Sequence, residues 1–223
     1  MIDFPYLADI VESTPSRILM LVVDGLGGLP HPETGKSELE TARIPNLDRL
    51  AQRSACGLTV PVLPGVTPGS GPGHLALFGY DPVKYTIGRG VLEAIGIGLD
   101  VRDGDVAARG NFCAIDATGL VTDRRAGRIS TERCQELCQR LSAVKLEGVE
   151  VVVAPVREHR FVLLLRGPGL SPDVSETDPQ RTGVAPLEPR AESARGRRTA
   201  RLAGAWVRQA RALLVDAAPA NMV

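Results

Sequence analysis

A serine lies in a loop rich in glycine and proline, directly before an apolar stretch. Residues 67–82 read TPGSGPGHLALFGYDP, with Ser70 in the loop and a short helix predicted after Gly73. Backbone N–H groups at the start of a helix attract negative charge, phosphate included. Ser70 therefore suits a nucleophile in phosphoryl transfer. A structural alternative stays open, because serine is also a leading N-cap residue.

An aspartate follows the most apolar run of the chain. Residues 17–23 read RILMLVV, and Asp24 and a group of glycines come next. A continuous apolar run is typical of a buried parallel strand. Open α/β sheets place their ligands at the carboxyl ends of such strands, where Asp24 would lie. The alternative is that Asp24 only begins a turn, since Asp-Gly pairs are common in turns.

Several arginines lie in contexts that suit anion binding. Arg89 stands between two glycines, and we expect it to be exposed on a mobile loop. Arg124, Arg125 and Arg128 fall within five residues and form a compact cationic loop. A guanidinium can grip a phosphate or a carboxylate with two parallel hydrogen bonds. The alternatives are a surface arginine and a solvated basic turn.

Composition sets further bounds on the function. The 223 residues contain 26 basic and 26 acidic side chains, so the formal net charge is zero. This balance predicts neither a nucleic-acid partner nor a membrane partner. We expect a cytoplasmic protein, because residues 1–17 do not resemble a signal peptide and no apolar run reaches the length of a membrane span. The four cysteines form no Cys-x-x-Cys pair and are expected to be reduced.

The remaining elements are predicted from apolar periodicity and cap residues. We expect a helix near residues 46–51, with Asn46 as its N-cap and a buried face beginning at Leu47 and Leu50. Residues 56–60 predict a strand, and residues 105–116 and 120–123 predict a hairpin. A helix is expected over 130–142, strands over 150–154 and 159–166, and a long amphipathic helix over 191–214.

Several of these motifs together resemble the archaeal-type, cofactor-independent phosphoglycerate mutases of the alkaline phosphatase superfamily. In the serine motif, Ser70, His74 and residues 79–82 match, whereas Gly71 and Gly73 replace the Asp and Ala that are usual there. The segment VVDGLG around Asp24, residues 88–96 (GRGVLEAIG), residues 108–112 (ARGNF) and residues 121–129 (VTDRRAGRI) resemble further motifs of the family.

The resemblance implies an α/β fold: an alkaline-phosphatase-like α/β/α sandwich, incomplete here, with an inserted small α+β domain. It implies an N-terminal part of the phosphatase-like domain over 1–98, the inserted substrate-binding domain over 99–186, and a return segment over 187–223. The implied activity interconverts 3-phosphoglycerate and 2-phosphoglycerate through a phosphoserine. The cofactors would be two divalent metal ions, manganese or else magnesium, without 2,3-bisphosphoglycerate.

The resemblance also implies roles for single residues. Ser70 would be the nucleophile and, with Asp24, a metal ligand. Residues expected to bind the substrate are His74, Arg89, Asn111, Asp123, Arg124, Arg125, Arg128, His159 and Arg160. The partner would be a small phosphorylated molecule, with no nucleic acid or membrane, and a homo-oligomer is compatible with this reading.

The acids and histidines in the last part of the chain are too few for the metal site that the resemblance implies. After Asp178 the acids are Glu188, Glu192 and Asp216, and no histidine follows. We therefore expect the chain to be the N-terminal portion of a longer enzyme and to be inactive by itself. Two alternatives stay open: another metal-dependent phosphotransferase or phosphatase of the superfamily acting on a small metabolite, and a non-catalytic domain that binds anions.

Overall fold

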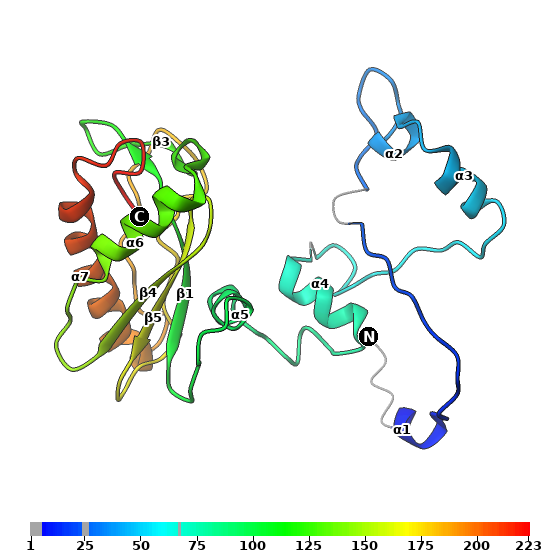
Figure 1. Cartoon of the computed structure of the whole chain (residues 1–223), viewed down its shortest axis with the longest axis horizontal. Helices are drawn as coiled ribbons and strands as arrows, with labels where there is room; N and C mark the ends of the chain where they lie inside the picture. Colours follow the sequence, from blue (N-terminus) through cyan, green and yellow to red (C-terminus); the bar gives the residue numbers. More distant parts are fainter. Residues whose placement is uncertain (1–5, 24–26, 67) are drawn as a thin grey trace. The chain divides into compact units, whose positions relative to one another are not determined.

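A computed structural model describes residues 6–23, 27–66 and 68–223. Contacts within the chain divide it into two units, residues 1–68 and 69–223 (Figure 1). Asp24, expected to bind metal, lies outside the described residues. The domain boundaries predicted after residues 98 and 186 stay predictions.

The described part of the first unit contains three short helices: α1 (Leu7–Ile10), α2 (Glu38–Thr41) and α3 (Pro45–Ala51). Helix α2 begins with a capping box, in which Glu40 N donates to Ser37 Oγ at 3.3 Å and Ser37 N donates to Glu40 Oε2 at 2.8 Å. Helix α3 has Pro45 in its first turn, so its N-cap is Ile44 and the prediction of Asn46 was wrong.

The two strands predicted in the first unit do not form. Residues 17–23 and 56–60 are described, and none of them is in a strand. A strand needs a neighbouring backbone to satisfy its hydrogen bonds, and no described residue of this unit supplies one. Ile18 is consequently 95% exposed and Leu58 fully exposed. The buried face predicted for α3 is also absent, because its leucines are exposed.

The second unit is built on an antiparallel sheet in the order β1–β5–β4, where β1 is Val106–Asn111, β5 is Arg160–Arg166 and β4 is Glu150–Arg157. Helices α6 (Thr131–Leu141) and α7 (Arg197–Leu214) pack against one face. Helix α5 (Arg89–Gly96) packs against the other (Figure 1). The strands and helices predicted for residues 105–214 are therefore of the right kind.

Alternation along the central strand explains these two layers. Phe161, Leu163 and Leu165 point into the larger core, which also contains Leu137 of α6 and Trp206 of α7. The side chains between them, Val162 and Leu164, point to the opposite face and pack with Ala94 of α5. A strand that is apolar on both faces is buried on both, as the continuous run of residues 161–165 indicates.

Most elements predicted for the second unit are confirmed, with shifted ends. Helix α6 begins after Ser130, whose Oγ accepts from Arg133 N at 3.2 Å. The strand predicted over 105–116 divides into β1 and β2 (Ala114–Ile115), and β2 pairs with β3 (Val121–Asp123). Helix α7 begins at Arg197 rather than near residue 191 and is preceded by the 3₁₀ turn η2 (Ala194–Gly196).

The cysteines are all unpaired, and the described helices fall short of the requirements of a membrane span. All four cysteines are described and are free thiols, as expected for reduced residues. Cys134 and Cys138 share the buried face of α6. Among the described residues, no helix has both the length and the apolar character that crossing a bilayer requires.

Candidate functional site

Ser70 is the first residue of helix α4 (Ser70–Leu77), and Gly69 is the N-cap. The helix therefore begins earlier than predicted, and Ser70 is not itself the capping residue. No described side chain caps this helix start, which leaves the N–H groups of Ser70 and Gly71 available to a negatively charged group, while Pro72 has no N–H. His74 Nδ1 lies 2.6 Å from the Ser70 carbonyl oxygen, one turn further along the same helix.

Arg89 begins helix α5 instead of lying on a mobile loop, and its N-cap is Gly88. Its guanidinium reaches the start of α4, where a Cβ added at Gly69 would lie 3.2 Å from Arg89 Nη2. The structure thus brings the expected anion-binding Arg89 next to the residue that precedes Ser70.

Helix α5 also approaches the edge of the sheet. A Cβ added at Gly90 would lie 1.9 Å from the Ala107 carbonyl oxygen. The backbone of α5 is therefore in direct contact with the backbone of β1. One turn further, Glu93 Oε1 lies 3.9 Å from Arg109 Nη1. Burial lowers the pKa of Arg109, and the charges of Arg89 and Arg160 lower that pKa further, against the effect of Glu93.

Asn111 and Arg160 stand directly opposite each other on β1 and β5. Residues opposite each other in an antiparallel pair share a face, and so do residues two apart in one strand. Asn111, Arg109 and Arg160 therefore lie on the face that α5 covers. The buried Asn111 Oδ1 has no hydrogen-bond partner among the described residues.

The loop after β3 contains the second expected group of arginines, and its shape is set by Asp123. The Asp123 carboxylate accepts from Arg125 N at 2.8 Å and from Gly127 N at 2.7 Å, and these bonds hold its pKa below the usual range. Arg124 Nε and Nη2 donate to the Asp178 carboxylate at 2.9 and 2.7 Å. The guanidinium of Arg124 is thus held by Asp178, and both side chains are about one-third exposed.

His159 lies in the turn between β4 and β5 and is 2% exposed. Its Nδ1 has no hydrogen-bond partner in the described part of the chain, and Glu158 Oε2 is 3.8 Å away. Burial lowers its pKa, and the charges of Arg160, Arg125 and Arg128 lower it further. We therefore expect a neutral imidazole at His159 near pH 7, within the influence of three guanidinium charges.

The second unit thus brings most of the expected substrate residues together. Arg89, Asn111 and Arg160 gather on the α5 face, while Arg125, Arg128 and His159 gather around the loop after β3. Glu93 and Arg109 lie within the motifs at residues 88–96 and 108–112, yet neither was expected to bind the substrate. The signals that could have found them are the two-residue spacing of Arg109 and Asn111 on a strand, and the four-residue spacing of Arg89 and Glu93 on a helix.

The described residues do not make a metal site by themselves. No group of three or more His, Cys, Asp or Glu side chains comes together within residues 6–23, 27–66 and 68–223. Of the two metal ligands expected from the sequence, Ser70 is described and Asp24 is not.

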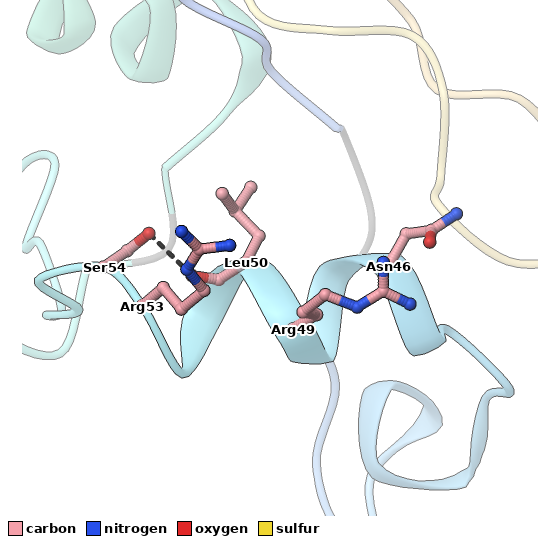
Figure 2. Close-up of a pocket in the computed structure, with 5 residues that line it drawn as sticks. All are labelled: Asn46, Arg49, Leu50, Arg53 and Ser54. Atoms are coloured by element: carbon pink, nitrogen blue, oxygen red, sulfur yellow. Dashed lines mark hydrogen bonds between the residues drawn. The ribbon is translucent and has the colours of Figure 1, made fainter.

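A surface hollow of about 500 Å³ lies in the first unit, lined by Asn46, Arg49, Leu50, Arg53 and Ser54 (Figure 2). All of these residues come from α3 and the turn that follows it. Ser54 Oγ donates to the Leu50 carbonyl oxygen at 2.7 Å, which closes the end of the helix. None of the expected site residues lines this hollow.

Comparison with known families gives a clear match. The model of the 2,3-bisphosphoglycerate-independent phosphoglycerate mutase family matches residues 51–221. The chain belongs to this family.

The chain is 52% identical over 215 residues to a probable mutase of this type from Thermus thermophilus, and the match covers 96% of this chain and 53% of the relative. The corresponding protein of Aquifex aeolicus is 46% identical, with 97% and 55% covered. The chain thus spans about half the length of the curated relatives it matches.

Solved structures agree with the mutase family. The cofactor-independent phosphoglycerate mutase of Thermoplasma acidophilum is 37% identical with a TM-score of 0.55, over 87% of this chain and 52% of that one. A protein of Pyrococcus horikoshii is 26% identical with a TM-score of 0.62, over 89% and 47%. The likeness confirms the fold class expected from the sequence, an alkaline-phosphatase-like α/β fold with a small inserted domain.

Proposed function

We propose that this chain supplies the nucleophile and the anion-binding residues of a cofactor-independent phosphoglycerate mutase, an isomerase that interconverts 3-phosphoglycerate and 2-phosphoglycerate. The observation that carries the proposal is the position of Ser70 at the start of α4, which no described side chain caps and which the Arg89 guanidinium approaches, in a chain of the mutase family. The enzyme would be cytoplasmic and act on a small phosphorylated molecule.

The proposed reaction uses Ser70 as a temporary carrier of the phosphoryl group. Ser70 Oγ attacks the phosphorus, the P–O bond to the glycerate breaks, and the serine proton ends on the released glycerate oxygen. The other hydroxyl of the glycerate then attacks the phosphoserine, the bond between Ser70 Oγ and phosphorus breaks, and the proton of that hydroxyl ends on Ser70 Oγ. The first-turn N–H groups of α4 and the guanidinium of Arg89 would hold the phosphoryl oxygens, and the remaining arginines the carboxylate.

Two divalent metal ions, manganese or else magnesium, complete this proposal. When bound, they would neutralise phosphate charge and favour ionisation of the serine hydroxyl. Asp24 and Ser70 would supply only part of their ligands. We propose that the other ligands come from the half of the mutase length that this chain does not match, and that the chain acts as part of a longer enzyme. The 223 residues alone would then lack turnover.

A direct test uses Ser70→Ala in the longer protein encoded by the source gene, assayed with 3-phosphoglycerate and metal. We expect turnover and phosphoserine, detected by mass spectrometry, to be lost while the far-UV circular dichroism stays the same. Ser54→Ala is the matched control, since its hydroxyl only bonds the end of α3. Substantial turnover in Ser70→Ala would overturn the assignment. A stop codon directly after Val223 would overturn the proposal of a longer enzyme.

One observation favours a second candidate, a phosphotransferase or phosphatase for another small metabolite. At Gly71, where Asp is usual in the resembled motif, a Cβ would lie 2.8 Å from Leu92 Cδ1. The position is therefore packed against α5 and has no room for an acidic side chain without a shift. A screen of phosphorylated metabolites with the longer protein separates the candidates, because a mutase should prefer phosphoglycerate over all others.

A further inference from the structure

We propose that Arg109 is an additional anion-binding residue, which works with Arg89 and Arg160 to hold a phosphorylated hydroxy acid on the α5 face of the sheet. The inference rests on the proposed function and extends it, because Arg109 lies within the motif at residues 108–112 but was given no role there. We call the cluster of Arg89, Arg109, Arg160 and Asn111 the arginine cradle.

The sheet fixes three members of the arginine cradle in one place. Arg109 and Asn111 are two residues apart on β1, and Asn111 faces Arg160 on β5. These strands lie in the hydrogen-bonded core of the second unit (Figure 1). The cradle members on β1 and β5 thus stand on a rigid element, which suits the precise holding of a ligand.

Helix α5 connects this rigid element with the proposed nucleophile. The Gly90 main chain touches that of Ala107, only two residues before Arg109. Arg89 therefore begins its helix beside β1, and its guanidinium extends to Gly69, the neighbour of Ser70. A ligand bound between Arg89 and Arg109 would lie close to the start of α4.

The hydrogen-bonding groups of the arginine cradle are not used by the rest of the described chain. No described residue accepts a hydrogen bond from the side chains of Arg89, Arg109 or Arg160, and Glu93 at 3.9 Å is beyond hydrogen-bond distance from Arg109. By contrast, Arg166 donates to Asp105 at 2.8 Å. Guanidinium donors that no described residue uses are available to a ligand, and an anion accepts several hydrogen bonds at one place.

Asn111 narrows the chemical class of the ligand. Its buried Oδ1 lacks a donor among the described residues, and a buried acceptor without a partner is costly. A ligand hydroxyl would satisfy it. Guanidinium groups for phosphate and carboxylate, together with an acceptor for a hydroxyl, match a phosphorylated hydroxy acid rather than a simple anion.

The test measures binding to the 223-residue chain, so it does not depend on turnover. Isothermal calorimetry would compare inorganic phosphate and 3-phosphoglycerate for the wild type, Arg109→Gln, Arg109→Lys and Arg201→Gln. Arg201 is exposed on α7 and serves as the matched control. We expect Arg109→Gln to weaken 3-phosphoglycerate binding by about 10-fold or more, because at least one charged hydrogen bond is lost. Arg109→Lys should recover part of the loss, and Arg201→Gln should bind like the wild type.

Equal binding by Arg109→Gln and the wild type would overturn the inference, as would an equal loss in Arg201→Gln. If Arg109→Gln fails to fold, the guanidinium Nε–H resonance of Arg109 in the wild-type chain gives the second readout. It should shift when 3-phosphoglycerate is added, and an unchanged resonance counts against Arg109. The proposed function fails separately, through turnover in Ser70→Ala, which leaves this binding result intact.

Discussion

The main chains of Gly90 and Ala107 lie against each other without room for a side chain between them. A Cβ at Gly90 would come within 1.9 Å of the Ala107 carbonyl oxygen. This contact sets the position of α5 on the sheet and, with it, the position of Arg89 relative to Arg109. Glycine is required here by close approach and not by an unusual backbone angle.

Gly90→Ala should therefore separate α5 from β1. We expect a loss of about 2 kcal/mol or more in the free energy of unfolding, because the methyl group meets backbone that cannot turn aside. Phosphate binding should weaken as well, since Arg89 moves away from Arg109. Chemical denaturation and calorimetry measure the two effects.

Gly96→Ala is the matched control, at the other end of the same helix. A Cβ there would meet nothing within 4 Å. Its stability should change by less than about 1 kcal/mol, in the stabilising direction, since alanine favours the helix. Equal stability of the two variants would show that α5 does not rest on β1 as described.

Apolar runs and cap residues predicted the helices and strands of the second unit well, because these signals lie within the elements themselves. Ser130 caps α6 through its own hydroxyl, and the apolar run of β5 is long enough to be buried on both faces. The run over residues 17–23 is just as apolar, yet it forms no strand in the described chain. Apolarity indicates burial, whereas a strand also needs a partner, and partners are not visible in a local pattern.

The arginine cradle also depends on partners that a local sequence pattern does not show. The motif around Arg89 is visible in the sequence, but glycines on both sides suggested a loop. In the structure one of these glycines caps α5 and the other allows its close approach to β1. Arg109 was missed because its importance depends on strand register, which joins residues about fifty positions apart in the chain.

The ion pair between Asp105 and Arg166 should make stability depend on pH. The side chain of Asp105 is 2% exposed, and its carboxylate accepts from Arg166 Nη2 at 2.8 Å and from Arg102 N at 2.9 Å. These bonds hold the pKa of Asp105 below its usual value. A carboxyl with a lowered pKa stabilises the fold above its unfolded pKa of about 3.9, and the effect is lost as the pH falls through the folded pKa.

Asp105→Asn should therefore lower the melting temperature at neutral pH, and its difference from the wild type should shrink below about pH 4. Asp103→Asn, two residues away and exposed, is the control and should melt like the wild type at both values. A difference for Asp105→Asn that is independent of pH would show that the charge of Asp105 does not matter.

The four thiols should differ strongly in reactivity. Burial, with the charges of Asp178 and Asp123, raises the pKa of Cys113 to about 12. Cys134 and Cys138 are buried in the core, whereas Cys56 is exposed. Because the thiolate is the nucleophile, iodoacetamide near neutral pH should label Cys56 first and the others only after unfolding.

Intact-mass spectrometry would follow this labelling. Cys56→Ser should abolish the fast adduct, and denaturant should expose the three remaining thiols. Fast labelling of folded Cys56→Ser would mean that the core around α6 opens far more readily than its burial indicates.

His159 should add a second pH dependence at milder acidity. Its folded pKa is lowered by burial and by Arg160, Arg125 and Arg128, while Glu158 opposes the shift. The unfolded chain, with a histidine pKa of about 6.5, binds the proton more readily than the folded chain. Stability from the neutral imidazole is thus fully present above that pH and is lost as the pH falls toward the folded pKa.

His159→Gln cannot take up the proton, so its melting temperature should fall less than that of the wild type over this range. The ring resonances of His159, assigned by their absence from His159→Gln, should titrate below the ordinary histidine range. A wild-type resonance that titrates within it would remove the physical basis of this prediction.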